Sequence, residues 1–143
     1  MPSDLWLKTM NAVHRTAIKV TGGRIGQEFF GMPVVELITT GRRSGTPRAV
    51  MLTSPVQEGD AYVIVASRGG DDQHPAWFLN LRDNPKVQAS VRGGPRVPMQ
   101  ASIATPQERA RLWPQVVAQY KDYGEYQKRT RREIPLVLLR PAP

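Results

Sequence analysis

The amino-acid sequence predicts a mainly β protein, a small antiparallel β-barrel that carries helices on its outside. Short apolar segments recur at near-regular spacing, and turns such as Glu58-Gly59-Asp60 and Gly93-Gly94-Pro95 separate them. No Gly-x-Gly-x-x-Gly follows any of these segments, which argues against a Rossmann-type dinucleotide fold. The sequence therefore favours an antiparallel barrel over parallel βαβ units.

The amino-acid composition indicates the size of the domain, the cofactors it can hold and the charge of its partner. The chain has 143 residues, which is long enough for one domain with a substantial core. It has no cysteine and only two histidines, so we expect no disulfide, no bound metal and a cytoplasmic location. The formal net charge of +8 predicts an anionic partner, and every apolar run is too short to cross a bilayer.

The first segment, residues 1–30, is predicted to contain an amphipathic helix over residues 4–20 and a glycine-rich connection. One face of this helix is apolar and another is basic. Such a helix packs against the barrel in one reading and makes a peripheral contact with an anionic membrane in the other. Residues 31–143 are predicted to form the barrel domain. The apolar face of the helix consists of Trp6, Met10, Val13, Ala17 and Val20.

The barrel domain contains the predicted strands and two further helices. One helix is predicted over residues 75–82. A longer helix begins after Thr105, because Pro106 suits the first helical position and Glu108 completes a capping box. Pro114 lies inside this longer helix and predicts a kink or a division there. The predicted strands are residues 34–40, 48–56, 61–67, 86–92, 97–104 and 136–140.

The turn Gly41–Gly45 is the first candidate site. Glycine at both ends of a turn allows its backbone N–H groups to converge on one point. Guanidinium and hydroxyl groups beside them suit a phosphate or a carboxylate. The alternative is an ordinary β-hairpin loop with solvated arginines. The side chains that form the predicted anion grip are Arg42, Arg43, Ser44 and Arg48.

Two further segments repeat or extend this chemistry. Ser67-Arg68-Gly69-Gly70 again places a hydroxyl, a guanidinium and paired glycines at the end of a strand. In the helix that follows, Trp77 and Asn80 are three residues apart and share a face, so an indole wall and an amide lie together. A buried tryptophan beside a satisfied asparagine is the alternative reading.

A row of three tyrosines is the last candidate. The charged residues between them make a deeply buried helix improbable, so we expect half-exposed rings whose hydroxyls reach a ligand, with simple packing as the alternative. No acid–base or nucleophilic set stands out, which fits an enzyme whose cofactor supplies the chemistry. The row consists of Tyr120, Tyr123 and Tyr126.

These segments, taken in order, resemble the deazaflavin-dependent nitroreductase family of actinobacteria. Its members are split β-barrel, FMN-binding-like proteins of the flavin and deazaflavin oxidoreductase superfamily, and they bind the 8-hydroxy-5-deazaflavin coenzyme F420. The resemblance extends from about residue 30 to the C-terminus. Its matching segments are residues 37–45 with 47–48, 65–70, 75–81, 84–87, 108–109, 113–114, the tyrosine row and 132–135.

The resemblance implies a reductase that transfers a hydride from reduced F420 to a quinone, an activated enone or a nitroaromatic. It implies that Arg42, Arg43, Ser44 and Arg48 hold the phosphate and the polyglutamate tail of the coenzyme. The deazaflavin would contact Val50, Met51, Leu52, Ala66, Ser67 and Arg68, and Pro75, Trp77 and Asn80 would close over it. Ser67 would also act in catalysis, together with Tyr120, Tyr123 and Tyr126, at the substrate.

Alternatives and departures accompany this interpretation. The same arginines suit the single phosphate of FMN, so an FMN-dependent split barrel is the nearest alternative. A basic barrel that binds single-stranded nucleic acid is disfavoured, because Tyr62 is the only aromatic residue on a predicted strand. Thr53 stands where some relatives carry an aromatic residue, and Arg68 stands where a lysine is frequent.

Overall fold

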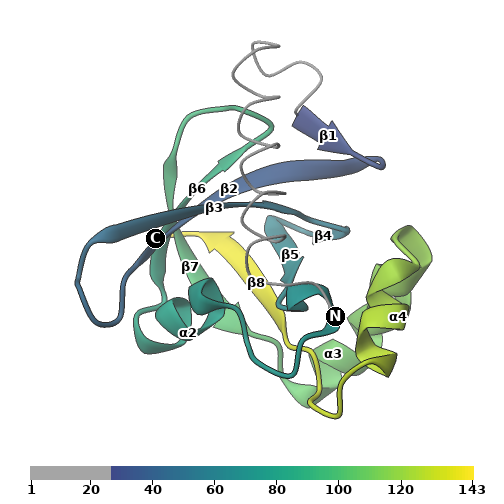
Figure 1. The fold of residues 1–143 in the computed structure, drawn as a ribbon. Helices are drawn as coiled ribbons and strands as arrows, with labels where there is room; N and C mark the ends of the chain where they lie inside the picture. The colour runs from purple at the N-terminus through teal and green to yellow at the C-terminus, as the bar shows by residue number, and fades with distance from the viewer. Residues whose placement is uncertain (1–26) are drawn as a thin grey trace.

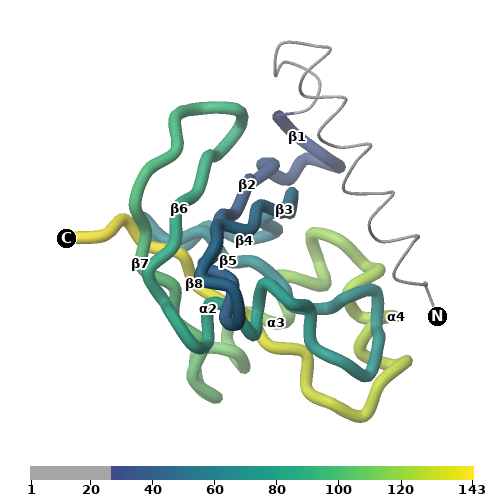
Figure 2. Tube along the Cα trace, turned by 60° about the vertical axis from the view of Figure 1, so that its left-hand side comes forward, coloured from purple at the N-terminus to yellow at the C-terminus, as the bar shows by residue number. Residues whose placement is uncertain are grey.

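The computed structural model describes residues 27–143, whose strands form one curled, antiparallel, open half-barrel (Figures 1 and 2). The eight strands of this region follow the order β1-β2-β6-β7-β8-β5-β4, and β3 pairs with β2. The predicted mainly β, split-barrel class is thus confirmed. The predicted helix over residues 4–20 lies outside the described residues. The strands are β1 (Glu28–Phe29), β2 (Met32–Thr40), β3 (Pro47–Thr53), β4 (Val56–Glu58), β5 (Ala61–Val65), β6 (Lys86–Val91), β7 (Val97–Ile103) and β8 (Leu136–Pro141).

The segment predicted as one strand over residues 48–56 is two strands, β3 and β4. Ser54 separates them, and it is fully buried. Its N–H donates to Pro33 O at 3.0 Å, and its hydroxyl lies 2.9 Å from Val56 O and 2.8 Å from Val63 O. Ser54 therefore ties the β2–β3 part of the sheet to the β4–β5 part.

Strand β8 is buried on both faces, and this divides the core in two. Val137 and Leu139 belong to a cluster inside the curl, together with Trp77 and Phe78. Leu136 and Leu138, together with Leu112 and Val116, belong to a cluster on the other face. The side chains of a strand alternate between faces, so the apolar run 136–139 serves both clusters. Each fully buried leucine contributes about 1.5–3 kcal/mol.

Three α-helices in the described region cover these clusters (Figure 1). The predicted capping box is confirmed, since Thr105 Oγ1 accepts from Glu108 N at 3.2 Å and Thr105 N donates to Glu108 Oε1 at 2.9 Å. The predicted division at Pro114 is wrong, because the helix continues to Gln119. Ala110, whose carbonyl loses a partner through Pro114, is exposed and can bind water. The helices are α2 (Ala76–Asp83), α3 (Pro106–Gln119) and α4 (Asp122–Lys128).

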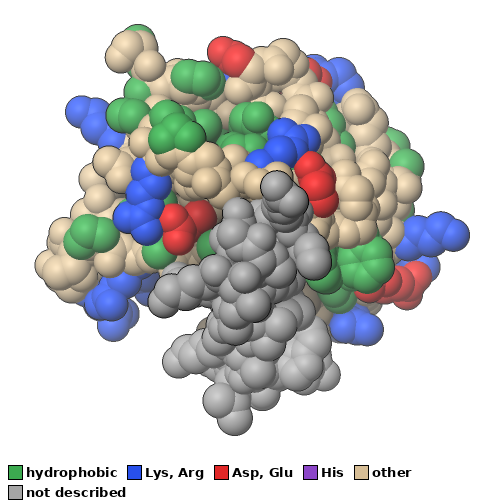
Figure 3. Space-filling view, turned by 90° about the horizontal axis from the view of Figure 1, so that it is seen from above, with side chains coloured by type: hydrophobic (Ala, Val, Ile, Leu, Met, Phe, Trp, Pro, Cys, Tyr) green, Lys and Arg blue, Asp and Glu red, His purple; other side chains and the backbone are tan. Residues whose placement is uncertain are grey.

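Much of the positive charge is paired on the surface. Figure 3 shows basic side chains in separate places on the face it presents, several of them beside acidic ones. Ion pairs join Arg92 to Glu28 at 2.6 Å and Arg96 to Glu36 at 2.9 Å. Within residues 27–143, no helix combines the length and the apolar character needed to span a membrane. The membrane contact expected of residues 4–20 stays a prediction.

Candidate functional site

The Gly41–Gly45 turn connects β2 to β3 and is folded by its own hydrogen bonds. Gly41 N donates to Thr46 O and Gly45 N to Gly41 O, both at 2.8 Å, while Thr46 N donates to Ser44 Oγ at 3.2 Å. These N–H groups are therefore used within the turn, and the expectation that they converge on a ligand is wrong for them. The N–H groups of Arg43 and Ser44 have no partner among the described residues.

Asn80 connects this turn to α2. Asn80 is only 4% exposed, and its Oδ1 accepts from Arg42 N at 3.2 Å and from Arg42 Nη1 at 3.0 Å. Its Nδ2 donates to Thr39 Oγ1 at 3.1 Å. The amide thus uses both of its polar ends inside the protein, so Asn80 orients the first arginine of the turn.

A cleft of about 580 Å³ lies between this turn and the start of α2. Arg43 and Arg48 are exposed at the cleft, and neither has a hydrogen-bond or ion-pair partner within the described part of the chain. Neither Asp nor Glu is among the described residues that line it, so there the cleft combines exposed cations with the apolar wall of Trp77. The lining residues are Gly41, Arg42, Arg43, Ser44, Pro47, Arg48, Ala49, Val50, Ala76, Trp77 and Asn80.

Several other predicted coenzyme residues meet in the core beside this cleft. Ala66 and Trp77 belong to one hydrophobic cluster, against which Val50 and Leu52 pack. Met51 alternates with these two residues along β3 and is buried. Strand β3 pairs with β2 alone among the described strands, so no second described strand covers its other edge. Pro75 is buried directly before α2.

The second predicted turn does not present a free cation. Arg68 pairs with Asp71, with Nη1 and Oδ2 2.7 Å apart and both side chains 18% exposed. Ser67 is buried, and its hydroxyl has no hydrogen-bond partner among residues 27–143. The structure thus leaves the serine, and not the arginine, as the uncommitted polar group of this turn.

The tyrosine row differs from the prediction in two respects. Tyr120 ends α3, whereas Tyr123 and Tyr126 lie on α4. Tyr123 is buried, and its hydroxyl lies 3.2 Å from Thr53 Oγ1, so the expectation of an available hydroxyl is wrong for this ring. Tyr120 and Tyr126 are half-buried, and each packs edge-on against Tyr123. The row therefore divides between two helices, with its middle ring in the core and its outer rings half-buried.

Burial raises the pKa of all three phenols. The pKa of Tyr123 rises from 10.0 to about 12, and those of Tyr120 and Tyr126 also rise, in both cases through burial first and then through the nearby Asp122. A phenol with a raised pKa stays protonated through neutral pH and above. The half-buried pair, Tyr120 and Tyr126, can therefore donate hydrogen bonds to an acceptor oxygen.

We expect Tyr123→Phe to lower the free energy of unfolding by about 1 kcal/mol at pH 8, because the hydrogen bond to Thr53 is lost. The folded-state pKa is raised, so the stabilisation by the neutral phenol is complete below pH 10 and is lost as the pH rises to about 12. The free energy of unfolding of the wild type should therefore approach that of Tyr123→Phe as the pH rises from 10 to about 12. Urea unfolding between pH 8 and pH 12 measures it, and Thr53→Val, which keeps the phenol, should retain the wild-type pH dependence. A difference between the two proteins that stays constant over this range would contradict the prediction.

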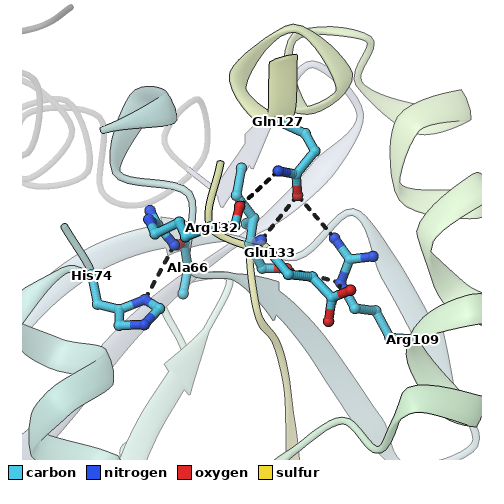
Figure 4. Close-up of polar contacts among 7 residues, drawn as sticks. Ala66, His74, Arg109, Gln127, Arg132 and Glu133 are labelled. Carbon is cyan, nitrogen blue, oxygen red and sulfur yellow. Dashed lines mark hydrogen bonds and ion pairs between the residues drawn. The ribbon is translucent and has the colours of Figure 1, made fainter. Parts of the chain in front are cut away.

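A polar network near the second turn was missed from sequence (Figure 4). Arg132 Nη2 donates to Ser67 O at 2.8 Å, and its Nη1 lies 3.1 Å from His74 Nδ1. Burial, then Arg132 and Arg82, lower the pKa of His74, so the ring is neutral and Nδ1 accepts. The only signal was the segment Arg132-Glu133-Ile134-Pro135 within the family resemblance.

A second cleft, of about 470 Å³, lies beside this network but is a weaker candidate. Its cations are largely committed elsewhere. Arg129 lies over the ring of Tyr126, Lys128 pairs with Glu125 at 3.3 Å, and Arg132 binds backbone carbonyls. The cleft between the first turn and α2 therefore remains the better anion site.

The open half-barrel places the chain among the split-barrel proteins, and its arginine-lined cleft is a candidate site for an anionic coenzyme. Comparison with known families agrees with this class and narrows it. The model of the F420H(2)-dependent quinone reductase family matches residues 10–141, and the chain belongs to this family. It is accordingly an oxidoreductase whose cofactor is F420.

Individual relatives support the assignment. An F420H(2)-dependent quinone reductase of Mycobacterium tuberculosis H37Rv is 42% identical over 132 residues, which cover 89% of this chain and 87% of the relative. A solved F420-H2-dependent reductase has a TM-score of 0.66 at 38% identity and covers 75% of this chain and 93% of its own. A second solved structure, a domain-swapped dimer, has a TM-score of 0.68 at 34% identity and covers 92% and 98%.

Proposed function

We propose that the protein reduces quinones by transferring a hydride from F420H2, with activated enones and nitroaromatics as further acceptors. The observation that carries this proposal is the cleft between the β2–β3 turn and α2. It combines Arg43 and Arg48, which have no partner among the described residues, with the indole of Trp77 and the edge of β3 that pairs with no other described strand. A coenzyme with a planar ring and an acidic tail needs both kinds of surface.

The residues present fit F420. Arg43 and Arg48 would bind its phosphate and acidic tail, and Asn80 would keep Arg42 oriented for the same anion. The backbone along Val50–Leu52 would bind the polar edge of the ring, with Trp77 as its wall. An FMN phosphate suits the same arginines, but the family that the chain matches depends on F420. Arg68 is paired with Asp71, so its assigned contact with the ring would use the backbone of the turn.

The bound, reduced deazaflavin supplies a hydride from C5. The protein's part is to polarise the acceptor and to provide a proton, because a quinone that gains a hydride also needs one proton to become a hydroquinone. Ser67, whose hydroxyl has no hydrogen-bond partner in the described part of the chain, is proposed to donate a hydrogen bond to the acceptor oxygen. Tyr120 and Tyr126, which stay protonated, are the proposed proton donors, whereas Tyr123 supports them from the core.

The test is a titration of the purified full chain with oxidised F420 and, separately, with FMN, followed by cofactor fluorescence. Steady-state assays with F420H2 then compare a soluble quinone, an enone and a nitroaromatic. We expect saturable binding of F420 and fastest turnover with the quinone. Saturation by FMN alone would contradict the coenzyme assignment, and turnover of the nitroaromatic alone would contradict the quinone as acceptor.

Asn80→Ala is expected to lower the free energy of unfolding by about 1–3 kcal/mol, because it strips partners from buried Thr39 and from Arg42. We also expect F420 to bind roughly ten-fold more weakly. Without Asn80, Arg42 is no longer held in place, and a loss of about 1.4 kcal/mol in binding free energy corresponds to that factor. Asn80→Asp keeps the acceptor oxygen for Arg42 and should lose less. Denaturant unfolding and fluorescence titration measure both effects.

The matched control for Asn80 is Asn84→Ala. Asn84 accepts a hydrogen bond from Lys86 N at 3.2 Å at the other end of α2 and does not line the cleft. We expect this variant to bind F420 like the wild type. If Asn80→Ala and Asn84→Ala bind F420 equally well, Asn80 has no role in orienting the anion grip.

A further inference from the structure

The turn that follows Ser67 has a strained backbone. Three consecutive residues have positive φ: Arg68 at 47°, Gly69 at 65° and Gly70 at 85°. Glycine adopts such angles freely, but arginine does so at a free-energy cost. The turn's own hydrogen bonds are Gly70 N to Ser67 O at 3.0 Å and Asp71 N to Arg68 O at 3.2 Å. A strained turn keeps one shape when surrounding groups hold it.

Arg132 contacts this turn on both sides, and Figure 4 shows its guanidinium beside Ala66 and His74. Before the turn, its Nη1 donates to Ala66 O at 3.2 Å and its Nη2 to Ser67 O at 2.8 Å. After the turn, its Nε donates to Asp71 O at 2.8 Å. The planar fork of one guanidinium therefore binds three carbonyls that bracket the left-handed residues, which a lysine ammonium cannot do. Ser67 O accepts from Arg132 and from Gly70 N together, so the clamp acts on the turn's own hydrogen bond.

Arg132 is itself held in place by the helices. Gln127 of α4 donates from Nε2 to Arg132 O at 2.8 Å. Gln127 Oε1 accepts from Arg109 Nη2 of α3 at 3.1 Å and from Ile134 N at 2.9 Å (Figure 4). The guanidinium thus stands at the end of a chain of hydrogen bonds that begins on α3. Such a network restrains its members more than isolated bonds do.

The residue that the clamp positions is Ser67. This residue is 8% exposed, and its hydroxyl has no hydrogen-bond partner within residues 27–143. Buried polar groups nearly always have partners, so an uncommitted hydroxyl at a predicted site indicates one supplied by a ligand. Its carbonyl, by contrast, is held by Arg132, so the backbone of this residue is fixed while its hydroxyl remains available.

We propose that Arg132 is a positioning residue: its guanidinium clamps both sides of the left-handed turn 68–70 and so fixes Ser67 at the reaction site. The role of Ser67 in the reaction rests on the proposed function, whereas the contact of Arg132 with the turn 68–70 does not. One experiment tests the contact of Arg132 with the turn, and a second tests the role of Ser67.

The clamp is tested by amide hydrogen exchange on the coenzyme-free full chain. Arg132→Lys keeps the charge but not the fork. We expect the peptide that contains residues 68–72 to exchange at least ~10-fold faster in this variant, since Gly70 N and Asp71 N lose the support of the carbonyl contacts. Arg131→Ala, at the exposed neighbouring residue, is the control and should exchange like the wild type. Exchange in Arg132→Lys that matches the wild type would overturn the clamp, whether or not the protein reduces quinones.

A double-mutant cycle of Ser67→Ala and Arg132→Lys tests whether Arg132 affects catalysis by positioning Ser67. With F420H2 and a soluble quinone, we expect each single variant to lower kcat roughly 10-fold while Kd for F420 changes less than about 3-fold. The double variant should be about as slow as the slower single one. If kcat of the double variant instead falls roughly 100-fold, the two effects are independent, and Arg132 does not act through Ser67. Wild-type kcat in Ser67→Ala would instead overturn the role of Ser67, and the exchange experiment still decides the clamp.

Discussion

Replacing Arg43 and Arg48 together with alanine is expected to raise the Kd for F420 by at least about 100-fold. Each guanidinium is exposed at the cleft and has no partner within the described region, so its donors are available to an anion. A hydrogen bond to a charged group contributes about 1.5–3 kcal/mol, and two such losses give roughly 3 kcal/mol or more. Fluorescence titration of the variant with oxidised F420 measures the change.

The control for this pair removes the same charge elsewhere. Arg96 and Arg111 are exposed and ion-paired, with Glu36 and Glu58, outside the cleft. Arg96→Ala with Arg111→Ala should leave Kd within about 3-fold at 0.15 M salt, because long-range attraction between exposed charges is screened there. Equal losses in the two double variants would show that F420 responds to net charge and not to the turn.

Gly70→Ala is expected to lower the free energy of unfolding by about 3 kcal/mol. A left-handed φ of +85° disfavours alanine by about 1–2 kcal/mol. The added Cβ would also lie 2.8 Å from Tyr126 O and 3.0 Å from Tyr126 Cα, which are backbone atoms of α4, so the helix would have to move. For a chain of this size the expected loss lowers Tm by roughly 10 °C. Thermal unfolding measures it.

Gly59→Ala is the matched control for Gly70. Gly59 also has a positive φ, +61°, but no atom lies within 4 Å of the position that its Cβ would occupy. Gly59→Ala should lower the free energy of unfolding by about 1 kcal/mol, from backbone conformation alone. The difference between the two variants measures the packing of the second turn against α4. Equal losses would mean that this close approach contributes nothing to stability.

Local chemistry made much of the fold predictable. The strands, α2 and the capping box of Thr105 and Glu108 depend on residues within a few positions of one another. The same holds for the left-handed glycines of the turns. Pro114 is the exception, because its local rule favours a break while the packing of Leu112 and Val116 on either side keeps α3 continuous.

The sequence placed some of the predicted site residues together, but it did not predict what each of them contacts. Arg42, Arg43, Ser44, Arg48 and the Trp77–Asn80 pair do line one cleft. Their separate functions depend on contacts between distant segments. Asn80 reaches Arg42 across 38 positions, and this contact makes it a support for the turn. Arg68 is occupied by Asp71, and Tyr123 is buried against Thr53, so neither presents the group that its sequence context suggested.

Side-chain chemistry and short-range spacing account for most strands, for the turns and for the supply of cationic, aromatic and hydroxyl groups, so these could be predicted from the sequence. Which of these groups remain available to a ligand depends on contacts between distant segments. The curl of the sheet sets Arg132 against Ser67, 65 positions away, and leaves Arg43 and Arg48 without partners among the described residues. Hydrogen bonding and burial are properties of groups that meet in space, and no local pattern in the chain records which pairs will meet.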